Sequence, residues 1–186
     1  MTLDELIQRL RQDSIDAEPY LADAGDSQAL RGALEEICAT MGTPSVLIYN
    51  AARAVSHLDP EDVLTGRVSM LTDDYEVSVA GVLTCVRVLA PQMGEVGGGT
   101  IIVSSRPPAE LPSSRFLSHS LTIAALDLLV DLARADPRTL PNRVMHVRLL
   151  TDVAPRRRAP SVARLYWSLA HPSKKSGLVQ PGGELH

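Results

Sequence analysis

The 186-residue chain has 18 Lys and Arg against 22 Asp and Glu, and 45% of its residues are hydrophobic. This composition suits one domain with a buried core and argues against wholesale disorder. A basic face for nucleic acid is not expected, because the only dense basic run, residues 156–158, is typical of a solvated loop. No apolar stretch approaches the roughly 20 residues that a membrane span needs. With no signal-peptide pattern at the N-terminus, we expect a cytoplasmic protein.

The N-terminal part predicts two helices separated by a short strand. Residues 2–12 place four apolar side chains on one helical face, and Thr2 and Glu5 have the spacing of a capping box. Residues 18–23 are predicted to form a strand that leads into a turn. A second helix is expected over residues 27–41, which a glycine and a proline end.

The middle of the chain alternates buried strands with a long helix. Residues 45–49 are continuously apolar, as is typical of a strand covered on both faces. A helix is expected over residues 72–90, ended by Pro91 and by the glycine cluster at 94–99. Residues 100–104 predict the next buried strand.

Another helix is predicted over residues 115–135, with one side facing the sheet through Leu117, Leu121, Ala124, Leu128 and Leu132. A strand over residues 143–149 and a helix over 160–170, whose first residue is a proline, follow. Residues 177–180 are a candidate last strand.

This order of elements indicates an α/β fold. We expect one domain over residues 1–180, followed by a loose tail at 181–186. Strands that alternate with helices of ten or more residues favour a mostly parallel sheet of about five strands, with helices on both faces. The two cysteines, Cys38 and Cys85, lie in helical patterns and are expected to be small buried side chains. No spacing predicts a metal site.

Several segments, in order, resemble the short-chain dehydrogenase/reductase superfamily: 21–26, 46–52, 75–81 with 87–93, 99–105 and 162–169. The resemblance implies a Rossmann-like α/β/α fold that lacks the first β-α-β unit. It implies that Asp23, Asn50 and Ala51 are vestiges of a cofactor site, and that Ser78 takes the place of an asparagine in the family's fourth helix.

The family's phosphate-binding turn is not found in this sequence. In the family, a Gly-x-x-x-Gly-x-Gly turn follows the first strand and opens a helix whose N-terminus faces the cofactor pyrophosphate. Here no glycine precedes residue 25, and the cluster at 94–99 follows a helix and precedes a strand. A phosphate loop needs the opposite order. We therefore expect no competent NAD(P) site and assign no cofactor.

The catalytic Tyr-x-x-x-Lys pair is also missing. The positions four residues after the four tyrosines are Ala24, Arg53, Val79 and Ala170. Alignment places the tyrosine position near Ser118 and the lysine position near Thr122, while Ser105 or Arg106 takes the family's serine position. Because the chemistry needs a phenol whose pKa is lowered by an ammonium group, hydride transfer by this chain alone is not expected.

The remaining pocket is predicted to contain hydroxyls, a cation and a possible acid or base, namely Ser78, Ser105, Arg106, Ser118 and His119. His119 is one residue from the aligned tyrosine, so we expect it to point away from the pocket. Ser105 with a histidine would suggest nucleophilic catalysis. A serine hydrolase is disfavoured, however, because no Gly-x-Ser-x-Gly elbow exists and no supporting Asp or Glu can be placed.

Loss of the first two strands would open a gap in the family's sheet. Either the strand at 18–23 moves in and pairs with 45–49, which we favour, or another chain covers that edge. The helices at 72–90 and 115–135 are apolar over much of their circumference. We therefore expect a homodimer, or a heterodimer with a subunit of the same family.

Three functions remain open. The favoured one is a non-redox pseudoenzyme or partner subunit with a possible small-molecule ligand. The second is a repurposed non-redox enzyme, such as a lyase, isomerase, dehydratase or cyclase. The third is an NAD(P)-dependent oxidoreductase completed by a partner chain.

Overall fold

The computed structural model describes residues 2–53, 63–106, 116–149 and 155–172. Three parallel strands form one sheet in the order β1-β2-β3. The strands are β1 (Val46–Tyr49), β2 (Thr100–Ser105) and β3 (Arg143–Arg148). The helices are α1 (Leu3–Gln12), α2 (Ser27–Met41), α3 (Val68–Tyr75), the π-helical η2 (Glu76–Ala80), α4 (Gly81–Glu95), α5 (Leu117–Ala135), the 3-10 helix η3 (Pro137–Thr139) and α6 (Pro155–Ala170).

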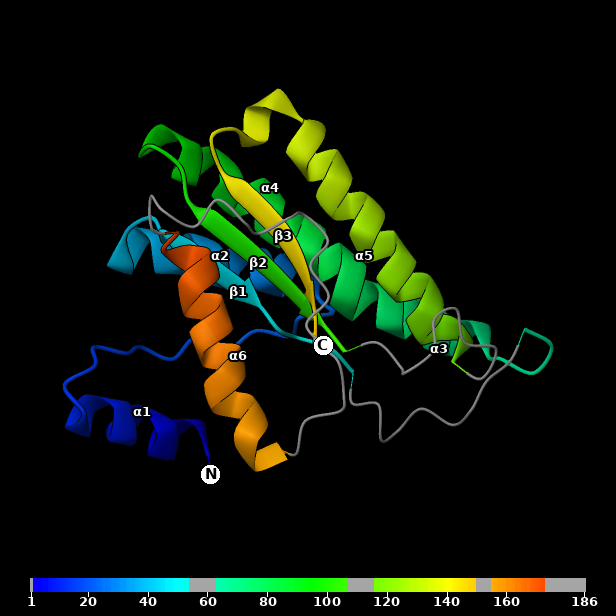
Figure 1. Cartoon of the computed structure of the whole chain (residues 1–186), viewed down its shortest axis with the longest axis horizontal. Coiled ribbons are helices and arrows are strands. Elements are labelled where there is room, and N and C mark those ends of the chain that lie inside the picture. The colour runs from blue at the N-terminus through cyan, green and yellow to red at the C-terminus, as the bar shows by residue number, and fades with distance from the viewer. Residues whose placement is uncertain (1, 54–62, 107–115, 150–154, 173–186) are drawn as a thin grey trace.

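The central strand β2 is buried along its whole length. Ile101 and Val103 point into a core shared with α2, α4 and α5, while Ile102 points into a second core under α6. Figure 1 shows α6 crossing one face of the sheet and α4 and α5 on the other. Each fully buried aliphatic side chain stabilises the fold by about 1.5–3 kcal/mol. The predicted three-layer α/β architecture with a parallel sheet is confirmed.

The sheet is smaller than predicted in the described part of the chain, because residues 18–23 are not a strand and do not pair with β1. Local hydrogen bonds hold this segment along α2 instead. Tyr20 Oη lies 2.6 Å from Thr40 Oγ1 near the end of α2, and Asp26 caps the start of α2 by accepting from two backbone N–H groups. The favoured pairing with β1 is therefore wrong. The expected strand at 177–180 and the tail at 181–186 lie outside the described residues.

α1 matches its predicted bounds and cap. The Thr2 backbone N–H donates to Glu5 Oε2 over 2.8 Å, and the Glu5 N–H donates to Thr2 Oγ1 over 3.2 Å. Of its residues only Ile7 is buried. The sequence therefore determines where this helix forms, although few tertiary contacts hold it.

Two prolines lie inside helices that they were expected to bound. Pro91 is within α4, which ends at Glu95 before the turn at Gly97 and Gly98, with φ of 98° and 97°. Pro160 is within α6, so the basic run at 156–158 belongs to a helix and not to a loop. A proline removes one helical hydrogen bond. Burial around α4, where Leu89, Ala90 and Met93 are almost completely covered, outweighs that loss.

Among the described residues, one helical stretch, Val68–Glu95, is long and apolar enough to cross a membrane by length and composition. In this structure 56% of its most apolar window is buried inside the fold. The stretch therefore has the burial of a core helix.

α5 is rotated relative to the sequence prediction. The leucines that were expected to face the sheet point outward: Leu121, Leu128 and Leu132 are 46%, 61% and 60% exposed. The buried side is formed by Ser118, Thr122, Ile123, Leu126, Val130 and Ala133. Because α5 has two apolar stripes, periodicity cannot say which one is buried.

Gly81 is expected to be intolerant of a side chain. A Cβ atom there would lie 2.0 Å from Tyr49 Oη and 2.9 Å from the Ala24 carbonyl oxygen. Tyr49 Oη donates to the Val77 carbonyl beside the π-helical turn, so the added methyl would also displace a buried hydrogen bond. We expect Gly81→Ala to lower the free energy of unfolding by about 2–4 kcal/mol, measured by urea denaturation.

Gly32→Ala is the matched control, because Gly32 lies in α2 and an added Cβ there meets nothing within 4 Å. It should stabilise the protein by about 0.5–1 kcal/mol through helix propensity. Equal urea midpoints for the two variants would contradict the packing described for Gly81.

Candidate functional site

A small cavity lies at the carboxyl ends of β1 and β2, beside the first turns of α5. Its volume is about 20 Å³, which is room for about one water molecule. Five of the predicted residues line it, namely Ala51, Ser78, Ser105, Arg106 and His119. The parallel sheet explains this convergence, because the carboxyl ends of neighbouring strands meet at one edge.

His119 faces this cavity, so the prediction that it points away is wrong. Its Nε2 lies 2.6 Å from the Arg106 carbonyl oxygen. Since a carbonyl oxygen only accepts, Nε2 must carry the hydrogen. The residue one turn later on the same face is Ile123, which also lines the cavity. The i, i+4 pairs of α5 that line the cavity are His119 with Ile123 and Thr122 with Leu126, and neither pair contains a phenol or an ammonium group.

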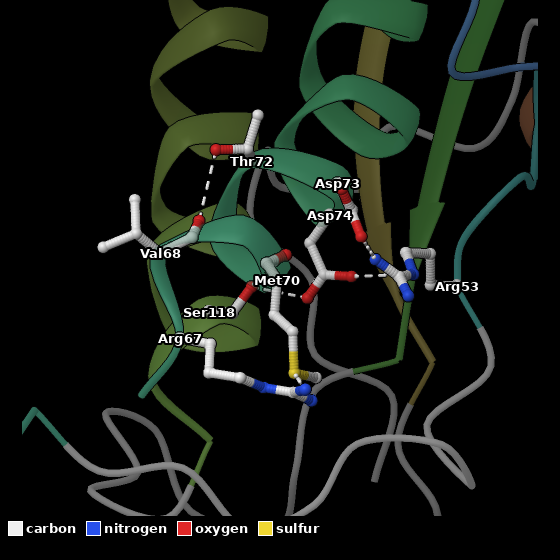
Figure 2. Close-up of polar contacts among 8 residues, drawn as sticks. All are labelled: Arg53, Arg67, Val68, Met70, Thr72, Asp73, Asp74 and Ser118. Carbon is white, nitrogen blue, oxygen red and sulfur yellow. Dashed lines mark hydrogen bonds and ion pairs between the residues drawn. The ribbon is translucent and has the colours of Figure 1, made fainter. Parts of the chain in front are cut away.

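Ser118, predicted to line the pocket, points instead toward α3. Its hydroxyl lies 2.5 Å from Asp74 Oδ2, and Asp74 is only 4% exposed (Figure 2). Arg53 Nε lies 3.6 Å from the other Asp74 oxygen and also pairs with Asp73 over 2.5 Å. A buried carboxylate needs such partners, because an unpaired one would be costly. Ser118 thus fastens α5 to α3 and lies outside the cavity.

Asn50 and Asp23, the other predicted vestiges of a cofactor site, lie apart from the cavity lining. Asn50 Oδ1 lies 2.6 Å from Ser104 Oγ, so it is held at the end of β1. Asp23 accepts from the Gly25 N–H over 2.8 Å and lines a second, open hollow of about 320 Å³. That hollow carries four carboxylates and one guanidinium, from Asp23, Asp26, Asp73, Glu76 and Arg53. Its charge does not suit an anionic cofactor.

A chain of hydrogen bonds leads from the cavity into the layer between the sheet and α5. Ser105 Oγ at the end of β2 lies 2.7 Å from His146 Nε2 on β3. His146 Nδ1 lies 2.7 Å from Asp127 Oδ1 on α5, and Arg148 pairs with the second Asp127 oxygen. The His146 side chain is 5% exposed and that of Asp127 is 38% exposed. This series of hydrogen bonds therefore connects the cavity to the protein surface.

The direction of each bond in this chain follows from the groups themselves. An ionised Asp127 only accepts, so His146 Nδ1 carries the hydrogen. Nε2 of a neutral His146 then has a free lone pair, and Ser105 donates to it. Burial lowers the pKa of His146, against the opposing pull of Asp127, and Arg148 and Arg134 lower it further. His146 is thus kept in the neutral form that can accept a proton.

Sequence reasoning missed His146, Asp127 and Asp74. A histidine in the middle of a strand predicted to be buried, and an aspartate within an apolar helix, were usable signals. They did not show that the two residues meet. Within the described part of the chain, no group of three or more His, Cys, Asp or Glu side chains could hold a metal ion.

Stability should depend on pH through His146. Because the folded-state pKa of His146 is below its ordinary value of 6.5, the unfolded chain binds the proton more readily. The free energy of unfolding should therefore fall as pH drops below 6.5. Urea denaturation should show that the free energy of unfolding decreases more between about pH 7.5 and about pH 5.5 for the natural protein than for His146→Gln. Identical losses would show that His146 is not held neutral by burial.

Comparison with known proteins shows which family this chain belongs to. A family model described as short chain dehydrogenase matches residues 1–139. A short-chain dehydrogenase from Streptomyces avermitilis has 24% identity and a TM-score of 0.65, covering 90% of this chain and 64% of its own. One from Mycobacterium smegmatis has 16% identity and a TM-score of 0.75, covering 90% and 70%.

A metagenomic short-chain oxidoreductase in complex with NADP has 22% identity and a TM-score of 0.73, covering 88% of this chain and 74% of its own. Against a 7α-hydroxysteroid dehydrogenase the coverage falls to 55% of that chain. The chain thus spans just over half to about three quarters of these structures. A search of curated protein sequences found no significant match. The family model covers most of the chain, and the chain belongs to the short-chain dehydrogenase family.

Proposed function

We propose that this chain is a non-redox member of the short-chain dehydrogenase family, acting as a partner subunit with a small ligand pocket. The observation that carries the proposal is the pair His119 and Ile123 in the cavity. An imidazole four residues before an aliphatic side chain cannot reproduce a phenol activated by an ammonium group. Fold membership alone does not supply the chemistry.

Two further observations support this proposal. The glycine turn at Gly97 and Gly98 leads out of α4 into β2, whereas a pyrophosphate is held by a turn that opens a helix. The hollow beside Asp23 is acidic and would repel a dinucleotide's phosphates. In the part of the chain that the structure describes, the residues therefore do not fit a nicotinamide cofactor.

The cytoplasmic location expected from the sequence stays a prediction.

The purified chain should bind neither NADPH nor NADH. It should also show no hydride transfer. Calorimetric titration with each cofactor should give no binding tighter than about 1 mM. The same titration on any complex purified from the native host tests whether a partner completes the site. NADPH oxidation with a ketone, at a rate proportional to the concentration of this chain, would refute the proposal.

The partner is proposed to be a second copy of this chain, docked through α5. The outward stripe of Leu121, Leu128 and Leu132 lies on one face at i, i+7 and i+11. Such a stripe can meet itself across a two-fold axis, burying leucines from both copies. By contrast, α4 packs against α2 and η3, and many of its side chains lie in the main core together with residues of the sheet. The proposed dimer interface therefore lies on α5.

Sedimentation should show a dimer at micromolar concentration that Leu128→Glu converts to a monomer. A charge placed in an apolar contact would be buried without a partner, which costs several kcal/mol. Leu21→Glu is the control: Leu21 is 86% exposed and lies in the coil before α2, so this variant should remain dimeric. A monomeric natural protein would refute the α5 contact.

The second function, a repurposed non-redox enzyme, is favoured by one specific observation. The serine, histidine and aspartate between β2, β3 and α5 are hydrogen-bonded in the order that nucleophilic catalysis needs.

A further inference from the structure

We propose that Ser105 is a nucleophile that accepts an acyl group from a small activated acyl donor, such as a short-chain thioester. His146 is the base, and Asp127 positions it. The proposal extends the non-redox function and does not require the α5 dimer. It supplies the acidic support that the sequence could not place.

The geometry meets the two conditions for an activated serine. Ser105 is one of the residues that line the cavity, and its hydroxyl lies 2.7 Å from His146 Nε2, within the reach needed for proton transfer. Asp127 accepts from the other ring nitrogen over 2.7 Å, which fixes the tautomer and stabilises the imidazolium that would form. Residues on two neighbouring strands and one helix hold all three side chains, so little reorganisation is needed.

The electrostatics agree with this assignment. The Asp127 carboxylate and the guanidinium groups of Arg148 and Arg134 face His146, and the arginines oppose its protonation. Arg106 is among the residues that line the cavity, and a positive charge there would favour the negative charge that develops on an acyl oxygen.

The acylation step is balanced without any further reactant. As Ser105 Oγ attacks the thioester carbonyl carbon, the new O–C bond forms and the C–S bond breaks. The Ser105 proton moves to His146 Nε2, and the sulfur leaves as a thiolate, which takes a proton from solvent. The imidazolium then loses its proton to solvent along the side that Asp127, 38% exposed, connects to the surface.

The position of His146 limits the substrate class. His146 lies behind Ser105 and does not line the cavity. It can take the serine proton but does not reach a leaving group there. Only donors whose leaving group departs as an anion should react, such as thiolates, with a pKa of about 8.5, or phenolates, about 10. The cavity of about 20 Å³ excludes bulky acyl groups, so the proposed donor carries the smallest one available, an acetyl group.

A purely structural role is the competing explanation. Ser105, His146 and Asp127 satisfy one another's hydrogen bonds, as buried polar groups must. The two roles differ in reactivity: a structural serine has an ordinary hydroxyl, whereas an activated one reacts faster as His146 loses its proton.

The test is covalent labelling with methanesulfonyl fluoride, a small reagent that forms an O–S bond with an activated serine and releases fluoride. Peptide mass spectrometry should find one adduct, on Ser105. Ser105→Ala should abolish it, and His146→Gln should slow labelling by about 100-fold. The labelling rate should rise with pH and level off, with a midpoint below the ordinary histidine value of 6.5. Acetyl transfer from p-nitrophenyl acetate to Ser105 should follow the same pattern.

Two controls separate reactivity from folding. Ser168→Ala removes a hydroxyl on the exposed side of α6, and Asp131→Asn changes an exposed aspartate one turn from Asp127 on α5. Both should label at the natural rate, whereas the labelling rate of Asp127→Asn should be lower by a factor of at least about 100. Circular dichroism establishes that each variant is folded.

Three results would overturn the proposal: no adduct on Ser105 in the folded natural protein, equal labelling of His146→Gln, or a labelling rate that does not fall as the pH is lowered through the acidic range below the ordinary histidine pKa of about 6.5. None of them bears on the non-redox function. Hydride transfer would refute that function while leaving Ser105 labelling unchanged.

Discussion

The structure depends on the complete burial of β2 between two layers of helices. A strand covered on both faces can satisfy its backbone polar groups only by pairing on both edges, and β1 and β3 provide that pairing in parallel. Parallel pairing brings the carboxyl ends of all three strands to one edge of the sheet. Ser105 and Arg106 therefore reach the same small volume as the first turns of α5. The candidate site is a consequence of the core.

Rotation of α5 then decides which side chains the site receives. Its two apolar stripes could each have been buried. The polar positions differ between the two rotations: in the observed one Ser118 meets Asp74, and Asp127 meets His146. Because a buried carboxylate or imidazole without a partner is costly, these contacts favour one rotation over the other. In the observed rotation of α5, His119 lines the cavity in place of the expected Ser118, so the cavity receives an imidazole instead of a hydroxyl.

Family membership alone does not decide the chemistry of this chain. The fold and the family match are clear, yet the groups around the cavity are an imidazole, hydroxyls, a guanidinium and apolar side chains. Members of a family share the fold that brings the ends of strands and loops together. The side chains at those ends, and therefore the chemistry, can differ from one member to another. Here the neighbouring strand β3 contributes His146, so the hydrogen bonds that start at Ser105 continue to Asp127 on α5.

The sequence alone determined the order of helices and strands, the α/β class, the family and five residues of the cavity, because periodicity, capping and strand burial are local signals. It also showed that no tyrosine in the chain is followed by a lysine four residues later, since this spacing can be checked without a structure. The rotation of α5, the meeting of Ser105, His146 and Asp127, and the failure of residues 18–23 to pair with β1 were decided by tertiary structure. These depend on contacts between segments far apart in the chain, where burial and hydrogen-bond satisfaction choose among locally equivalent arrangements.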